Sequence, residues 1–288
     1  MVSALQVSEA RIEGFLQPIA LRIYEPSRQS SQQRSHLAVG RLAVELRPIV
    51  LYFHGGGFVG GSLDQAQVAA SFIATHAGAM VISVAYSLAP AYPFPAAPED
   101  GYRAAKWAVG QAGSRASKPR LGVAGHDAGG NLATCVAAMA RDRGEVVISA
   151  QALLAPLLDP SMTRVGDGAL ITSDVKLNEC AQCYRAYLPN ASQRLHPYAA
   201  PLESSRLAGL PPALIASAQN DVLHVEAERY ASALIAAGVP TQVTRHRNAS
   251  HAGLAADVAA LAEVALFLRQ RLAATQPLAV TEFDTPEF

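Results

Sequence analysis

Three short stretches of this 288-residue chain contain residue types that could act together in catalysis. The first is His54–Phe58, which has three consecutive glycines and directly follows a predicted strand. Consecutive glycines allow backbone N–H groups to turn outward and to approach a substrate oxygen closely. Acyl-transfer chemistry needs such donors to stabilise the oxyanion of its transition state. Taken alone, the stretch also fits an ordinary glycine-rich turn.

The second stretch is Gly125–Asn131, which reads Gly-His-Asp-Ala-Gly-Gly-Asn and lies between a predicted strand and a predicted helix. Small residues two positions before and two positions after Asp127 permit a sharp strand–turn–helix elbow. Such an elbow presents its central side chain at the carboxyl edge of a sheet. Asp is also a favoured residue at the start of a helix, so a simple helix cap is the alternative.

The third stretch combines Asp221, which follows a late predicted strand, with His251, which lies in a loop before the last predicted helix. Together with Asp127 they give the chain order nucleophile, acid, histidine that elbow-type sites use. A single Asp or His is more often a surface or capping residue. The ordered set of three therefore predicts one shared site.

Apolar runs rich in branched residues alternate along the chain with amphipathic helical patterns. The predicted strands are Ile19–Tyr24, Ile49–Phe53, Met80–Tyr86, Arg120–Ala124, Ser149–Leu154, Ala213–Ser217 and Thr241–Thr244. The predicted helices are Asp64–His76, Ala97–Val109, Asn131–Arg141, Val225–Ala237 and Ala255–Leu272. This alternation implies an α/β fold in which helices cover both faces of a parallel sheet.

Three segments interrupt this pattern. Ser27–Arg47 is polar at its start and is predicted to be a surface loop. Asp159–Pro201 shows no clear strand but one helical stretch, Leu177–Leu188, and we expect it to form a small cap inserted at 158–201. Thr275–Phe288 has no periodicity and is expected to be a loose tail.

Hydrophobic residues make up 50% of the chain, which is enough for one large core in a single domain spanning residues 1–288. Charged residues make up 16% and the formal net charge is +0, so neither nucleic acid nor an acidic membrane surface is expected as a partner. No apolar stretch approaches the roughly 20 residues that span a bilayer. Met1–Ala10 lacks the pattern of a signal peptide, and three cysteines, an odd number, favour a reducing cytoplasm.

Several further blocks accompany these stretches. They are Tyr86–Pro90 (Tyr-Ser-Leu-Ala-Pro), Pro93–Pro95, Glu99–Asp100, Pro197–Leu202 and Gly209–Ala213. Taken with His54–Phe58, they resemble the bacterial esterases of the hormone-sensitive lipase family, over a region from about Ile19 to Leu272. The resemblance implies an α/β-hydrolase fold with a small cap, and action on small carboxylic esters without a cofactor or metal. It leaves a homodimer as one option.

The resemblance also assigns roles to particular residues. The backbone N–H groups of Gly56, Gly57 and Ala128 would form the oxyanion hole. Asp221 would orient His251, which would act as the base.

Two features depart from the family pattern. Asp127 stands at the position that serine normally occupies. The chain also begins almost at its first predicted strand, although the family often carries a helical N-terminal lid. We therefore expect an open pocket that is roofed mainly by Asp159–Pro201.

A carboxylate at the central position of the elbow changes the chemistry. With a pKa near ~3.9 when unperturbed, Asp127 is already ionised at neutral pH, so His251 has no proton to remove from it. Two carboxylates flanking one imidazole should favour the charged imidazolium. After attack on an ester carbonyl, a carboxylate leaves more readily than an alkoxide, so turnover should be weak. Displacement at an sp3 carbon bearing a halide or an epoxide oxygen, followed by hydrolysis of the ester on Asp127, is sensible chemistry.

The sequence leaves four hypotheses open. The chain is an ester hydrolase weakened or redirected by Asp127, a hydrolase acting at sp3 carbon, or a non-catalytic binding protein on the same scaffold; alternatively, Asp127 is an engineered replacement of serine. The only tryptophan, Trp107, is expected away from the pocket, which argues against an indole halide cradle. Tyr184 and Tyr187 share one face of the predicted cap helix and are expected mainly to pack, although a lid acid is the alternative.

Four other residues are given no chemical role. Cys180 and Cys183 have redox-motif spacing, but they lie inside a helical stretch and lack the further ligands of a zinc site. Cys135 is predicted to be a small buried filler. The side chain of His126 is predicted to point away from the substrate.

Overall fold

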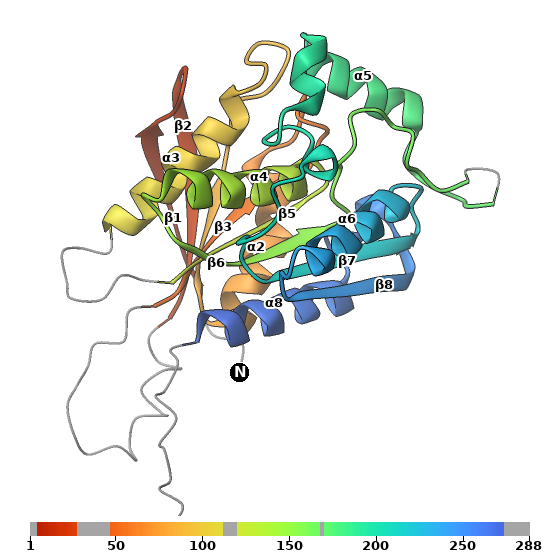
Figure 1. Ribbon diagram of the computed structural model, residues 1–288. Helices are drawn as coiled ribbons and strands as arrows, with labels where there is room; N and C mark the ends of the chain where they lie inside the picture. Colours follow the sequence, from red (N-terminus) through yellow and green to blue (C-terminus); the bar gives the residue numbers. More distant parts are fainter. Residues whose placement is uncertain (1–4, 28–46, 112–119, 168–169, 274–288) are drawn as a thin grey trace, which may run out of the picture.

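An eight-stranded sheet forms the centre of the computed structural model, which describes residues 5–27, 47–111, 120–167 and 170–273 (Figure 1). The strand order is β1-β2-β4-β3-β5-β6-β7-β8. The strands are β1 (Leu5–Glu13), β2 (Pro18–Pro26), β3 (Ile49–Phe53), β4 (Met80–Val84), β5 (Leu121–His126), β6 (Ile148–Leu154), β7 (Ala213–Asn220) and β8 (Thr241–Ser250). β1 and β2 run antiparallel to their neighbours, and the remaining pairs are parallel.

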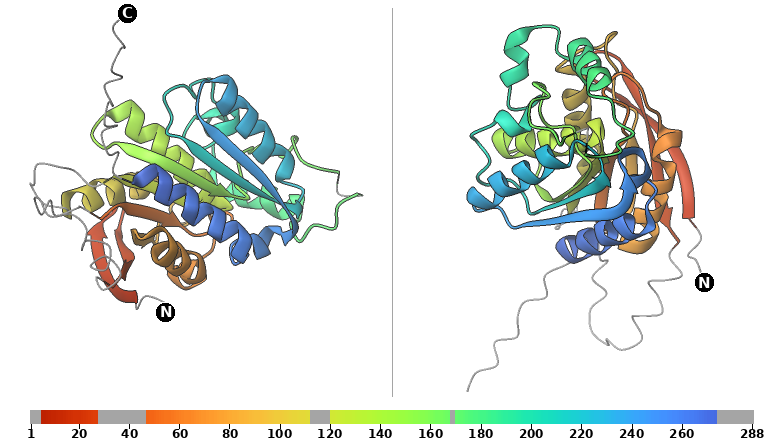
Figure 2. Two further views of the ribbon diagram at one scale, coloured as in Figure 1. Left: turned by 90° about the horizontal axis from the view of Figure 1, so that it is seen from below. Right: turned by 90° about the vertical axis from the view of Figure 1, so that its right-hand side faces the viewer.

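Helices cover both faces of this sheet (Figure 2). The α-helices are α2 (Leu63–Ala77), α3 (Ala96–Gln111), α4 (Ala128–Arg143), α5 (Leu177–Tyr187), α6 (His224–Ala236), α7 (His251–Leu254) and α8 (Val258–Leu272). Two short 3-10 helices, η1 (Ala191–Leu195) and η2 (Pro201–Glu203), follow α5. The buried side chains of α2 and α8 form one apolar cluster, whereas those of α3, α4 and α6 form a second cluster on the other face. The predicted α/β fold with a mostly parallel sheet is therefore confirmed.

The central strands are apolar throughout because they are covered on both sides. Every residue of β3 and of β5 is buried. β3 pairs in parallel with both β4 and β5, so Ile49 lies opposite Met80 and Leu121. This register brings the carboxyl ends of β3 and β5 side by side, and the glycine-rich stretch and the elbow follow directly from these two ends.

The prediction missed β1, and it shortened the last two strands. Most side chains of β1 and about half of those of β8 are exposed, because these are the two edge strands. An exposed edge strand needs few apolar residues, so its sequence signal is weak. The last helix begins at Val258 rather than Ala255, because the Asp257 side chain accepts the backbone N–H of Ala260 and fixes the helix start there.

The segment 159–201, here called the cap segment, contains α5 and η1 and lies outside the sheet (Figure 1). Tyr187 of α5 stacks on Phe58 with ring centroids 4.0 Å apart, and Tyr184 lies 5.7 Å from the same ring. Before Ile19 the described chain forms β1 and a turn rather than helices. Most of the loop predicted at Ser27–Arg47 and all of the tail predicted at Thr275–Phe288 lie outside the described residues. None of the described helices is long and apolar enough to cross a membrane.

Candidate active site

The elbow between β5 and α4 holds Asp127 in a strained backbone conformation. Its φ is 55° and its ψ is −121°, in a region that non-glycine residues rarely adopt. The turn needs glycine on either side: a Cβ at Gly125 would lie 2.2 Å from the oxygen of Gly129, and one at Gly129 would lie 2.1 Å from the oxygen of Phe53. The Asp127 side chain makes no capping hydrogen bond to α4, so the helix-cap alternative is wrong.

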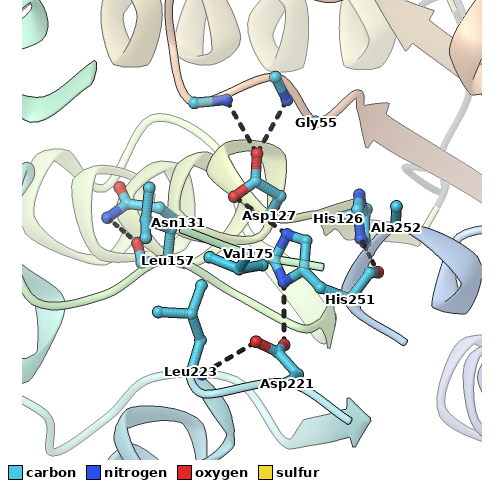
Figure 3. Close-up of polar contacts among 12 residues, drawn as sticks. Gly55, His126, Asp127, Asn131, Leu157, Val175, Asp221, Leu223, His251 and Ala252 are labelled. Carbon is cyan, nitrogen blue, oxygen red and sulfur yellow. Dashed lines mark hydrogen bonds and ion pairs between the residues drawn. The ribbon is translucent and has the colours of Figure 1, made fainter. Parts of the chain in front are cut away.

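Asp127, His251 and Asp221 lie in one cluster (Figure 3). The imidazole of His251 has its Nε2 atom 3.4 Å from Oδ1 of Asp127 and its Nδ1 atom 2.9 Å from Oδ2 of Asp221. Asp221 directly follows β7, and its Oδ1 atom accepts the backbone N–H of Leu223 at 2.9 Å. Three segments that are far apart in the sequence therefore place their side chains around one ring.

The backbone N–H groups of Gly56 and Gly57 both point at Asp127. Each donates a hydrogen bond of 2.8 Å to the same carboxylate oxygen, Oδ2. Both glycines have positive φ values, 119° and 60°, which turn their N–H groups in this direction. Ala128 is the next residue after Asp127 and the first of α4, and its role in an oxyanion hole stays a prediction.

The charges in this cluster reinforce one another. Burial disfavours the charged form of His251, but hydrogen bonds to Asp127 and Asp221, together with their negative charges, outweigh this effect and raise the pKa of His251 to about 10. Burial would by itself raise the pKa of Asp127. The hydrogen bond and charge of His251, with further contributions that include the N–H of Gly56, instead lower the pKa of Asp127 well below its usual range. At neutral pH the site is therefore an imidazolium between two carboxylates.

His126 contacts the backbone of His251 rather than the pocket. Burial and the nearby charge of His251 lower the pKa of His126 to about 4, so its ring is neutral at neutral pH. Its Nε2 atom lies 2.8 Å from the carbonyl oxygen of His251, which requires Nε2 to carry the proton and to donate it. The sequence analysis gave this histidine no role, since nothing in the sequence marks a contact between positions 125 residues apart.

A cavity of about 200 Å³ opens in front of Asp127. From the body of the protein its lining includes Gly57, Leu157 and His251. From the cap segment its lining is Asp174, Val175, Lys176, Glu179, Cys180 and Cys183. A larger surface cavity of about 420 Å³ is lined by Glu99, Tyr102, Arg103, Lys106, Arg143 and Glu145. Two ion pairs, Arg143–Glu99 and Lys106–Glu145, neutralise much of its charge, and it shares no lining residue with the cavity at Asp127.

The tyrosines and the cysteines of α5 lie in different environments. Tyr184 and Tyr187 are buried against Phe58 and do not line the cavity, which agrees with a packing role. Cys180 and Cys183, by contrast, are free thiols in the cavity wall, a placement that the sequence did not predict. Within the described residues, no group of three or more His, Cys, Asp or Glu side chains is placed to hold a metal ion.

Comparison with known proteins places this architecture in a family. Residues 50–255 match the family described as alpha/beta hydrolase fold. Esterase LipI of Mycobacterium tuberculosis is 39% identical over 257 residues, which cover 86% of this chain and 74% of the relative. The gibberellin receptor GID1 of Oryza sativa is 30% identical over 254 residues, which cover 81% of this chain and 71% of the receptor.

Among solved structures, the hyperthermophilic esterase of Pyrobaculum calidifontis superposes with a TM-score of 0.79 at 33% identity, covering 93% of this chain and 87% of the esterase. The likeness thus extends over most of the chain. This chain belongs to the α/β-hydrolase family, and several of its relatives are named esterases or carboxylesterases.

Proposed function

We propose that this chain has the site of a hydrolase of small carboxylic esters, and that Asp127 suppresses ester turnover in it. The observation that carries the proposal is the pair of 2.8 Å hydrogen bonds from Gly56 and Gly57 to Oδ2 of Asp127. These N–H groups are the ones that an ester carbonyl oxygen would need. The carboxylate of Asp127 therefore acts as an internal occupant of the oxyanion hole.

Two steps of ester hydrolysis are opposed by this arrangement. A neutral carbonyl oxygen would have to displace an ionised carboxylate, whose charge-assisted hydrogen bonds are about twice as strong as neutral ones. His251 would have to act as a base, but its pKa is raised to about 10 and it is already protonated at neutral pH. Replacing Asp127 by a small neutral residue removes the carboxylate from the oxyanion hole and lowers the pKa of His251, which then keeps only Asp221 as a charged partner.

The direct test compares Asp127→Ser, Asp127→Ala and Asp127→Asn with the unmodified chain on a panel of short acyl esters. Asp127→Ser should raise kcat/KM by roughly 10²-fold or more, since loss of the nucleophile costs serine hydrolases far more than that. Asp127→Ala empties the hole without adding a nucleophile, and Asp127→Asn keeps an uncharged side chain there. Both should stay inactive, and adding His251→Ala to Asp127→Ser should abolish the gain. Strong ester turnover by the unmodified chain, or a folded Asp127→Ser variant without any gain, would contradict the proposal.

A second candidate function, displacement at an sp3 carbon, is favoured by the same geometry. One oxygen of Asp127 is held by the two N–H groups, whereas Oδ1 lies beside His251 at the cavity. Attack by Oδ1 on carbon would expel a halide or an epoxide oxygen with the bonding electrons and leave a neutral ester on Asp127. The pKa of His251 would then fall because one of its two carboxylates is neutralised, so the ring could give its proton to the expelled oxygen or to solvent. As a neutral imidazole it could then take a proton from water.

In the second step of this candidate reaction, water gives a proton to His251 and attacks Cγ of Asp127, and the oxyanion forms on Oδ2, between the N–H groups of Gly56 and Gly57. The intermediate then collapses, the Cγ–Oδ1 bond breaks, and the product leaves as an alcohol that takes the proton back from His251. Turnover in ¹⁸O-labelled water would put label into the Asp127 carboxylate, whereas ester chemistry through a serine variant would not. No aromatic donor for the leaving group lines the cavity, since Tyr184 and Tyr187 are buried against Phe58. Because the cavity lacks such a donor, displacement at sp3 carbon ranks below ester hydrolysis as a candidate function.

A non-catalytic binding function is the third candidate, and its support is the receptor among the relatives. It requires a ligand that binds the unmodified chain in the cavity and is recovered unchanged. The small-molecule partner, the homodimer and the cytoplasmic location stay predictions from the sequence.

A further inference from the structure

Two consecutive residues of the cap segment contact both loops that carry the candidate catalytic side chains. Asp174 accepts the backbone N–H of His251 on Oδ1 at 2.9 Å and that of Ala252 on Oδ2 at 3.0 Å. Both of its oxygens are thus used to hold the turn in which His251 lies. The contact joins positions that are 77 and 78 residues apart in the chain.

Ser173 makes the matching contact with the loop that carries the acid. Its Oγ atom accepts the backbone N–H of Val222 at 3.3 Å, directly after Asp221, and that of Val175 at 3.1 Å. Gly166, earlier in the cap segment, donates its N–H to the carbonyl oxygen of Val222. One stretch of the cap segment is therefore bonded to the acid loop and to the histidine loop at once.

The peptide groups of His251 are held from opposite sides. Asp174 binds its N–H, and His126, which precedes Asp127 in the elbow, donates to its carbonyl oxygen at 2.8 Å. Burial would raise the pKa of Asp174, but hydrogen bonds from Ser250, Ala252 and His251 outweigh burial and lower it. The contact at Asp174 is therefore a pair of charge-assisted hydrogen bonds, which are stronger than neutral ones.

The same carboxylate borders the cavity. Asp174, Val175 and Lys176 are consecutive residues of its wall, to which Asp127 also belongs. A molecule that enters the cavity touches the strip of chain that fixes His251. Among the described residues of the cap segment that line the cavity, Asp174 alone is hydrogen-bonded to a catalytic loop. Asp174 therefore both lines the cavity and holds the backbone of His251.

We propose that Asp174 is a positioning residue that sets the backbone of His251 and thereby couples the cap wall of the cavity to the alignment of the His251 ring between Asp127 and Asp221. The activity part of this inference rests on the proposed ester-hydrolase function. A residue that only anchored the cap segment would make the same hydrogen bonds but would leave the His251 ring and kcat unchanged when it was replaced.

Activity is tested in the Asp127→Ser background with Asp174→Ala, Asp174→Asn and a control, Glu203→Ala. Glu203 pairs with Arg164 and so fastens the cap segment at a point that touches neither catalytic loop. Because small displacements of catalytic groups cost much of the rate, Asp174→Ala should lower kcat about tenfold or more with KM changed less than about threefold. Asp174→Asn keeps one acceptor oxygen and should lie between. Glu203→Ala should leave kcat unchanged.

The alignment is also measured without any activity, by imidazole ¹⁵N and proton NMR of the His251 Nδ1–H in the unmodified chain. Asp174→Ala and Asp174→Asn should shift or broaden this signal and change its titration, and Glu203→Ala should not. If Asp127→Ser gains no activity, the proposed function fails while the NMR result still decides the role of Asp174. If the Asp174 variants lower the melting temperature but leave the His251 signal and kcat in place, Asp174 is only an anchor and the inference is overturned. Should Asp174→Ala not fold, Asp174→Asn gives the same decision.

Discussion

Asp127 and His251 form a buried ion pair in which Oδ1 of the carboxylate lies 3.4 Å from Nε2 of the ring. This distance is at the long end of the range for a hydrogen bond, and both the hydrogen bond and the opposite charges favour the ionised forms of the two groups. Since Asp221 binds the other ring nitrogen at 2.9 Å, the imidazolium is balanced by two carboxylates. A histidine in this environment is already protonated at neutral pH, so it cannot accept a further proton as a base would. Its protonation can be measured through the pH dependence of stability.

The stability of the protein should depend on pH through this histidine. Because the pKa of His251 in the folded chain is about 10, above its unfolded value near ~6.5, the stabilisation is fully present below about pH 6.5. It is lost as the pH rises to about 10, with a slope on the order of 1 kcal/mol per pH unit. Asp127→Asn removes one carboxylate and lowers the pKa of His251. The pH range over which the stabilisation is lost therefore ends at a lower pH in this variant. In urea unfolding from pH 6 to pH 10 the total loss of stability should be larger for the unmodified chain than for Asp127→Asn. Equal losses would show that Asp127 does not hold the proton.

Gly57 should tolerate alanine less well than a glycine with similar backbone angles elsewhere. Gly57 has φ of 60° and Gly78 has φ of 68°, so alanine costs about 1 kcal/mol of backbone strain at either. A Cβ at Gly78 meets nothing within 4 Å, whereas one at Gly57 would lie 2.7 Å from Sγ and 3.1 Å from Cβ of Cys183. Gly57→Ala should therefore lower the free energy of unfolding by about 1 kcal/mol more than Gly78→Ala.

A substitution at Cys183 provides the control for the contact between Gly57 and α5. Cys183→Ala removes Sγ and should recover part of the extra loss in the Gly57→Ala chain. Equal losses at the two glycines in urea unfolding would mean that α5 does not press on the glycine-rich stretch.

Much of this arrangement could be predicted from the sequence, because local patterns carry it. The glycines around Asp127 and the order of Asp127, Asp221 and His251 gave the cluster, since each residue follows a recognisable strand or precedes a helix. The central strands are apolar along their whole length, so they were found almost to the residue.

The parts that could not be predicted depend on contacts over long distances in the chain. The occupation of both N–H groups by Asp127 itself follows from the register of β3 beside β5 and from a side-chain rotamer. The contact of Asp174 with the His251 turn has no sequence pattern, because irregular backbone forms it. Cys180 and Cys183 lie four residues before Tyr184 and Tyr187, so the four side chains share one side of α5. Packing of the tyrosines on Phe58 turns this side toward the body of the protein, and the two cysteines line the cavity there.

The two cap tyrosines should be structural rather than catalytic. The hydroxyl of Tyr187 is buried without a hydrogen-bond partner, and its ring stacks on Phe58. Tyr187→Phe removes the unsatisfied group and should leave stability unchanged or raise it by about 1 kcal/mol, whereas Tyr187→Ala should cost about 3 to 5 kcal/mol. Thermal unfolding of both variants measures this. A loss of turnover on any epoxide or haloalkane in Tyr184→Phe or Tyr187→Phe, with stability intact, would instead identify a lid acid.

The cavity cysteines provide a chemical probe of the site. Burial, with the added charge of Asp127, raises the pKa of the Cys180 thiol to about 12, and the pKa of Cys183 is raised for the same reasons. Since the thiolate is the reactive form, both should react slowly with iodoacetamide at pH 8. Asp127→Asn removes a negative charge that faces them, so both thiols should be alkylated severalfold faster in that variant, as followed by mass spectrometry of the cap peptide. Cys135 is buried behind the elbow and should stay unmodified in either chain, which makes it the internal control for local unfolding.

Alkylation of the Asp127→Ser variant should also block the ester turnover that this substitution restores, and Cys180→Ser with Cys183→Ser should protect against the block. Equal alkylation rates with and without the Asp127 charge, together with full ester turnover after alkylation, would mean that the two thiols and Asp127 do not share one cavity.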